Sequence, residues 1–170
     1  MREIVGQGLV LRRDDLGEFN ERVTFFTREW GKLKGKTISS RKPLSKLSPH
    51  LDIGNIVRFR CVEKHELQLV DALKMAITDF SLFDLNALDR LLFEDEIDED
   101  LWDILVKGNN SWEEVLSHLG WDKQYASCVT CSEKRVTAFD LGKQSYACEK
   151  CSGYLRGDDR LLLEVNRFVS

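Results

Sequence analysis

The chain has 170 residues, of which 42% are hydrophobic and only two are proline. This composition excludes a disordered or low-complexity chain and suffices for one elongated domain or two small ones. The net charge of −4 hides an asymmetry, because residues 1–70 carry 14 Lys and Arg against 9 Asp and Glu, whereas residues 71–127 carry 4 against 14. A basic first part in an acidic protein indicates that this part meets a polyanion.

Residues 2–73 alternate between apolar and polar side chains, which predicts five strands. We place them at residues 4–13, 20–28, 32–39, 51–61 and 66–72. Five short strands fit a small closed barrel over residues 1–73 such as an OB-fold, a common scaffold for nucleic-acid binding, with an SH3-like barrel as the nearest alternative. Cys61 follows Val57 and Phe59 at period two, so we expect it to be buried in a strand.

Basic side chains are concentrated in this predicted barrel. Strand alternation sends Lys32, Lys34 and Lys36 to one face, where they can follow a phosphate backbone, while Leu33 points to the other. Trp30 could stack on a base, and Phe26 is expected in the core. The predicted nucleic-acid contacts are Arg12, Arg13, Arg28, Trp30, Lys32, Lys34, Lys36, Arg41, Lys42 and Lys46. The alternative is a solvated strand face beside aromatic core residues.

From Asp71 the apolar period becomes helical, which predicts a short helical bundle within a second domain, residues 74–170. Asp98 and Ser111 each precede acidic residues and are expected to begin helices. The acidic run at residues 94–100 has no glycine where a calcium loop must turn, so we interpret it as a solvated loop with a helix cap. A last amphipathic helix is predicted over residues 158–169.

Four cysteines form two pairs, Cys128-x-x-Cys131 and Cys148-x-x-Cys151, inside this second domain. This spacing is typical of a structural zinc site with four thiolate ligands, and the residues between the pairs predict a short hairpin, so we expect a zinc ribbon at about residues 126–155. Two disulfides or a redox pair are the alternative. The start of the chain lacks a secretory signal and no apolar run is long enough to cross a membrane, so we expect a cytoplasmic protein with reduced thiols.

Catalytic chemistry has no visible place in the sequence. His50, His65 and His118 are isolated, and the chain has neither a phosphate-binding Gly-Lys-Ser/Thr loop nor a His-Glu-x-x-His motif. We therefore expect a protein that is not an enzyme and has no catalytic residues.

The N-terminal residues also resemble a known family. Gly8-Leu-Val-Leu-Arg-Arg-Asp-Asp-Leu-Gly-Glu18, followed by Val23-Thr-Phe-Phe-Thr-Arg-Glu-Trp-Gly-Lys32, is similar to the opening of RecO, the bacterial recombination mediator. The order of barrel, helices and four-cysteine ribbon is similar to that of the zinc-bearing RecO proteins, and Phe139-Asp140, Gly142 and Tyr146-Ala-Cys148 resemble their ribbon.

The resemblance implies a non-enzymatic DNA-repair factor of the nucleoid. Such a protein binds single- and double-stranded DNA, anneals complementary strands and, with RecR, helps to load RecA onto strands coated by single-stranded DNA-binding protein. Carried over by position, its DNA contacts are Lys32, Lys34, Lys36, Arg41, Lys42 and Lys46.

Two other classes of protein remain open from the residues alone. One is an interaction module in which the acidic, leucine-rich middle docks on a partner while the barrel is a scaffold. The other is a fragment of a ligase-like DNA enzyme, since NAD-dependent DNA ligases also join an OB-fold to a four-cysteine zinc element. The ligase predicts a Lys-x-Asp-Gly motif, which this chain lacks.

Overall fold

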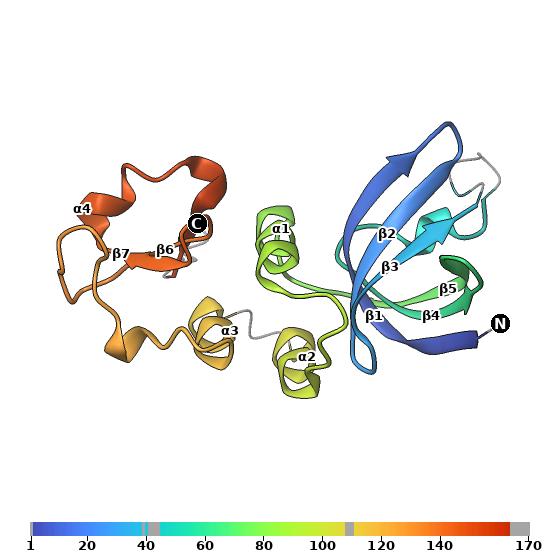
Figure 1. The fold of residues 1–170 in the computed structure, drawn as a ribbon, viewed down its shortest axis with the longest axis horizontal. Coiled ribbons are helices and arrows are strands. Elements are labelled where there is room, and N and C mark those ends of the chain that lie inside the picture. The colour runs from blue at the N-terminus through green and yellow to red at the C-terminus, as the bar shows by residue number, and fades with distance from the viewer. Residues whose placement is uncertain (1, 39, 41–44, 108–110, 164–170) are drawn as a thin grey trace, which may run out of the picture. The chain divides into compact units, whose positions relative to one another are not determined.

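The computed structural model describes residues 2–38, 40, 45–107 and 111–163. It divides into two compact units, Met1–Gly108 and Asn109–Ser170. The first unit holds a barrel and the helices α1 (Leu82–Leu91) and α2 (Glu99–Val106), and the second begins with α3 (Trp112–His118) (Figure 1). This division differs from the boundary expected after residue 73, because α1 and α2 belong to the same compact unit as the barrel.

Five strands close the barrel of the first unit (Figure 1). They are β1 (Arg2–Leu16), β2 (Asn20–Thr27), β3 (Gly31–Thr37), β4 (Asn55–Glu63) and β5 (Leu67–Ile77). Their order around the barrel is β1-β2-β3-β5-β4, with a parallel bridge between β3 and β5 at Lys36 and Gln68 and antiparallel pairing elsewhere. This is the topology of an OB-fold, so the predicted fold is confirmed.

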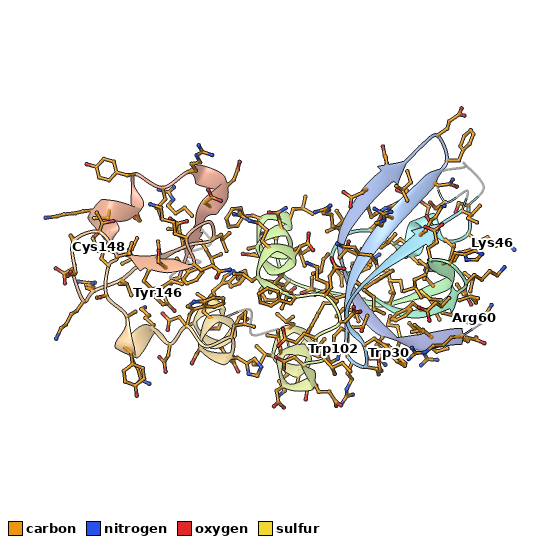
Figure 2. The ribbon with its side chains drawn as sticks, viewed as in Figure 1. Trp30, Lys46, Arg60, Trp102, Tyr146 and Cys148 are labelled. Atoms are coloured by element: carbon orange, nitrogen blue, oxygen red, sulfur yellow. The ribbon has the colours of Figure 1, made fainter. Side chains whose placement is uncertain are left out.

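The barrel is filled by the apolar residues at alternate strand positions. Phe25 and Phe59 stack inside it with ring centroids 5.4 Å apart. Cys61 is 1% exposed, as predicted, and burial raises the pKa of its thiol to about 12. Phe26 points out of the barrel, where it packs 6.3 Å from the ring of Trp102 on α2, which Figure 2 labels. The helical part therefore covers one side of the barrel wall.

Side-chain caps begin α1, α2 and α3. Ser81 and Asp84 form a capping box at α1. Asp98 accepts the amide of Leu101 at 2.8 Å and Ser111 caps α3, which confirms both predicted starts. An uncapped amide at a helix start is a lost hydrogen bond, so these residues fix where each helix begins.

The second unit is built around a small sheet in the order β7-β6-β8. Its elements after α3 are β6 (Ala138–Asp140), β7 (Ser145–Ala147), α4 (Glu149–Ser152) and β8 (Arg160–Leu162). Asp140 turns the chain between β6 and β7, because its carboxylate accepts the amides of Gly142 at 2.9 Å and Lys143 at 3.1 Å. The predicted hairpin is confirmed.

Three-residue 3-10 turns occur at Ser48–His50, Lys123–Tyr125 and Gly157–Asp159.

The helix predicted over residues 158–169 is wrong over residues 158–163, and residues 164–169 lie outside the described part. Gly157–Asp159 is a 3-10 turn, and β8 pairs with β6 from Ala138 to Asp140. The hairpin offers a free edge to which a short apolar run can bond, and this tertiary pairing overrides the local helical spacing.

Helices able to cross a membrane are absent from the described residues, since none combines sufficient length with an apolar composition.

We predict that Gly31→Ala destabilises the first unit more than Gly17→Ala. Both glycines have positive φ angles, +67° and +74°, so both substitutions strain the backbone. A Cβ at Gly31 would also lie 2.2 Å from the carbonyl oxygen of Glu96, whereas one at Gly17 meets no atom within 4 Å. In urea unfolding, Gly31→Ala should lose about 1 to 3 kcal/mol more than Gly17→Ala, and equal losses would contradict the packing argument.

Candidate nucleic-acid interface and metal centre

The predicted lysine row, Lys32, Lys34 and Lys36, lies on the outer face of β3. Its neighbours on β2 are Phe26 beside Lys32, Thr24 beside Lys34 and Arg22 beside Lys36. Alternation therefore sends the three lysines to one side of the strand, but packing against the helical part divides the row.

Lys32 is buried and holds the barrel to the end of α1. Its ammonium lies 2.8 Å from the carboxylate of Asp89 and donates to the backbone carbonyls of Asp89 and Leu92, the last at 3.1 Å. A cation suits the carbonyls that a helix leaves unpaired at its end. The prediction of Lys32 as a nucleic-acid contact is corrected, because its side chain is only 9% exposed and its donors are occupied.

Lys34 and Lys36 keep part of their side chains in solvent and pair with carboxylates. Lys34 pairs with Glu94, which lies after α1, and Lys36 lies 2.7 Å from Glu66. Both pairs are exposed, and exposed ion pairs contribute only about 0 to 1 kcal/mol. A phosphate group can therefore replace either carboxylate at little loss.

Arg13, predicted as a nucleic-acid contact, serves a structural role. Its guanidinium donates to both carboxylate oxygens of Glu21 at 2.8 Å, and its side chain is 19% exposed. Glu21 in turn accepts the hydroxyl of Ser40 at 2.7 Å, just before the basic loop that contains Arg41 and Lys42. The prediction is corrected, because the buried carboxylate already occupies this arginine and the pair holds the start of the loop.

Arg12 and Arg28 are half exposed and lie in ion pairs. Arg12 lies 2.9 Å from Asp14 and 3.2 Å from Asp89, and Arg28 lies 3.7 Å from Glu99 of α2. Both remain predicted contacts, although each would have to share its charge with a carboxylate.

Trp30 lies at the edge of a cavity of about 340 Å³ in the first unit, beside Ile4, Lys34 and Leu67. Its indole donates to the carbonyl of Val5 at 3.3 Å, and the guanidinium of Arg2 lies 5.0 Å from its ring centroid. This cation–π contact occupies one face of the ring. Stacking on a base stays a prediction that concerns the other face.

Lys46 is exposed and points away from the barrel in Figure 2, with no ion-pair partner among the described residues. Arg41 and Lys42 lie outside the described residues. Arg22 was absent from the predicted contacts, yet it is exposed on the same face as Lys34 and Lys36. Strand alternation could have identified it, since Arg22 and Phe26 are four residues apart and so share a face.

The two cysteine pairs come together in the second unit, where Figure 2 labels Cys148. All four sulfurs lie within 4.8 Å of one another, with Cys131 3.6 Å from Cys148 and 3.7 Å from Cys151. Sulfurs bonded at about 2.3 Å to a common tetrahedral ion lie about 3.8 Å apart. The four cysteines therefore could hold one metal ion.

The surroundings of the sulfurs favour the thiolate at Cys128, whereas the hydrogen bond with the thiol of Cys148 raises the pKa of Cys151 to about 12. Burial raises the pKa of the Cys128 thiol, but hydrogen bonds from the backbone of Cys148, Cys131 and Thr130 outweigh it and lower this pKa to about 6. The turns are rigid, since Ser132 donates its amide to Cys128 and Ser152 donates its amide to Cys148, both at 2.8 Å. A ring cluster of Phe139, Tyr146 and Trp121 supports the hairpin, with centroids 5.1 and 5.3 Å from Phe139.

The barrel defines the first unit as an OB-fold domain, a class that frequently binds single-stranded nucleic acids and oligosaccharides. A family model described as recombination protein O N terminal matches residues 1–77. Residues 1–77 are therefore similar to the N-terminal domain of RecO proteins.

A curated protein of the same name is similar to part of the chain. The chain is 39% identical over 66 residues to the DNA repair protein RecO of Chloroherpeton thalassium. The match covers 38% of this chain and 26% of that protein. The similarity is thus limited to a minor part of each protein.

We predict that Lys32→Met destabilises the first unit. Removing one partner of a buried ion pair leaves the other charge uncompensated, which typically costs about 3 to 5 kcal/mol, and we expect the lower value because Arg12 still pairs with Asp89. Lys36→Met is the matched control on the same strand and should change the free energy of unfolding by less than about 0.5 kcal/mol. Urea unfolding of both variants measures this, and similar losses would show that Lys32 is not a structural residue.

Proposed function

We propose that this chain is a DNA-binding and strand-annealing factor of recombinational DNA repair. The observation that carries the proposal is a set of exposed cations on the outer face of an OB-fold barrel that is similar to that of RecO. Among the described residues, the proposed contacts are Arg22, Lys34, Lys36 and Lys46, together with Arg12, Arg28 and Trp30. Arg41 and Lys42, outside the described residues, complete the proposed set.

The proposed mechanism is electrostatic and needs no catalytic residue. Phosphate charge of each strand is neutralised on the outer face of β2 and β3, which lowers the repulsion between complementary strands until pairing can begin. Lys34 and Lys36 can exchange their exposed carboxylate partners for phosphates, while Lys32 keeps the barrel and α1 together. The barrel thus presents Lys34 and Lys36 on the outer face of its strands.

The family suggests where this activity acts. The relative in Chloroherpeton thalassium is named a DNA repair protein. We propose that this chain works in the cytoplasm at the nucleoid with RecR, RecA and single-stranded DNA-binding protein as partners, and that it helps to load RecA.

We also propose that the ion of the metal centre is a structural Zn²⁺. Four thiolates complete a tetrahedral shell and leave no open position for water or substrate. The ion would hold α4, the β6–β7 hairpin and the two cysteine turns together, since few other interactions connect such short elements.

We predict that affinity for single-stranded DNA falls with salt. If about five phosphates are neutralised, the slope of log affinity against log salt is about −3.5, since each contact contributes about −0.7. The double variant K34E/K36E should flatten the slope by about 1.4 in a fluorescence-anisotropy titration. The matched control R58E/K74E reverses two exposed charges on β4 and β5 and should change the slope less.

Adding the complementary strand to the same samples tests annealing. The wild-type chain should speed duplex formation, and K34E/K36E should lose most of this gain. Binding that does not depend on salt, or that both double variants change equally, would refute the proposed interface.

We predict one zinc ion per chain, lost in Cys148→Ser. Zinc contributes an apparent 10 to 16 kcal/mol or so in zinc-finger peptides, so its loss should unfold the ribbon while the barrel stays folded. Elemental analysis gives the stoichiometry, and hydrogen exchange should rise in residues 128–162 only. Cys61→Ala removes a thiol outside the centre and should keep the zinc. A Cys148→Ser protein with full zinc content would refute the assignment.

A further inference from the structure

The linker between α1 and α2, residues 92–98, lies along the start of β3. Glu94 forms an isolated parallel bridge with Lys32, and the amide of Asp95 donates to the carbonyl of Lys32 at 3.2 Å. Gly31 lies so close that a Cβ there would contact the backbone of Glu96. The linker is therefore seated on the strand that carries the lysine row, not free in solvent as its acidic composition suggested.

The position of the linker on β3 brings carboxylates close to cations of the barrel. Glu94 accepts a hydrogen bond from Lys34, and Glu99, the first residue of α2, lies 3.7 Å from Arg28. The hydrogen bond from Lys34 is the main reason that the pKa of Glu94 is lowered. Glu94 is charged at neutral pH, as an exposed glutamate ordinarily is, and its carboxylate neutralises Lys34.

A DNA phosphate and the Glu94 carboxylate need the same ammonium donors of Lys34. We infer that the α1–α2 linker is an internal competitor of DNA, which covers part of the lysine row until a nucleic acid displaces Glu94. This inference rests on the proposed function, because it concerns regulation of the same surface.

The contacts of the linker near Lys34 are exposed, so DNA could displace the linker from this lysine. The Lys34 and Glu94 side chains are 41% and 56% exposed, whereas Lys32 and Asp89 are 9% and 7% exposed. Phe93 and Ile97 are 69% and 58% exposed, so neither anchors the linker in a core. The linker can therefore leave Lys34 while the buried pair keeps α1 on the barrel.

Competition of this kind favours polyanions over single anions. One phosphate gains little by replacing one carboxylate at Lys34, whereas a strand that also engages Lys36, Arg22 and Lys46 gains several contacts together. The linker would thus suppress binding of small anions more than binding of a DNA strand.

The test compares Glu94→Gln with Glu114→Gln in the full chain. Both variants remove one negative charge, but Glu114 lies on α3 in the second unit. We expect Glu94→Gln to bind a labelled oligothymidine about two- to fivefold more tightly than wild type at low salt, the range that an exposed ion pair gives. Glu114→Gln should bind as wild type does.

Hydrogen exchange supplies a second measurement on the same samples. Saturating oligothymidine should speed exchange of the Asp95 amide in the wild-type chain, because displacement breaks its bond to Lys32. Equal affinities of the two variants, or an Asp95 amide that DNA leaves protected, would overturn the inference while DNA binding itself stands. Absence of salt-dependent binding in every form would instead refute the proposed function, and the inference with it.

Discussion

The buried ion pair between Lys32 and Asp89 is the interaction on which the arrangement of the first unit depends. Lys32 faces outward from the barrel, yet it is buried because its ammonium pairs with the carboxylate of Asp89 and donates to two carbonyls at the end of α1. Neither ion could be buried alone, so the barrel and α1 constrain each other. The pair also fixes where the α1–α2 linker begins, which is why Glu94 reaches Lys34.

Charge in this molecule is organised by contacts rather than by segments. Residues 1–70 are basic and residues 71–127 are acidic, yet Asp89, Glu94 and Glu99 all lie in the same compact unit as the barrel. They pair with Lys32 and Lys34 of β3 and with Arg28, which follows β2. Arg22 and Lys46 are exposed without an ion-pair partner among the described residues. The surface proposed for DNA therefore leaves out Lys32, at the start of the lysine row, and includes Lys34, Lys36 and Arg22.

The interactions that stabilise the interior of the first unit differ from those that stabilise the second. The barrel has a core of stacked Phe25 and Phe59 with apolar strand residues around them. Among the described residues of the second unit, three short strands pack around Phe139, and the four cysteines lie close together in the turns that flank two of them. A small unit of this kind has little apolar surface to bury, so a metal ion held by these four cysteines, as proposed, would stabilise it in place of a large core.

The sequence by itself determined the barrel, the helix starts at Asp98 and Ser111, and the meeting of the four cysteines. These features depend on period-two alternation, on capping residues and on ligand spacing, all of which are local. Only the tertiary structure decided that Lys32 is buried, that Arg13 binds Glu21, that residues 160–162 join a sheet and that the acidic linker lies on β3. The partners of Lys32 and Lys34 are about 60 residues away in the chain, and no local pattern specifies which distant group will cover a given face.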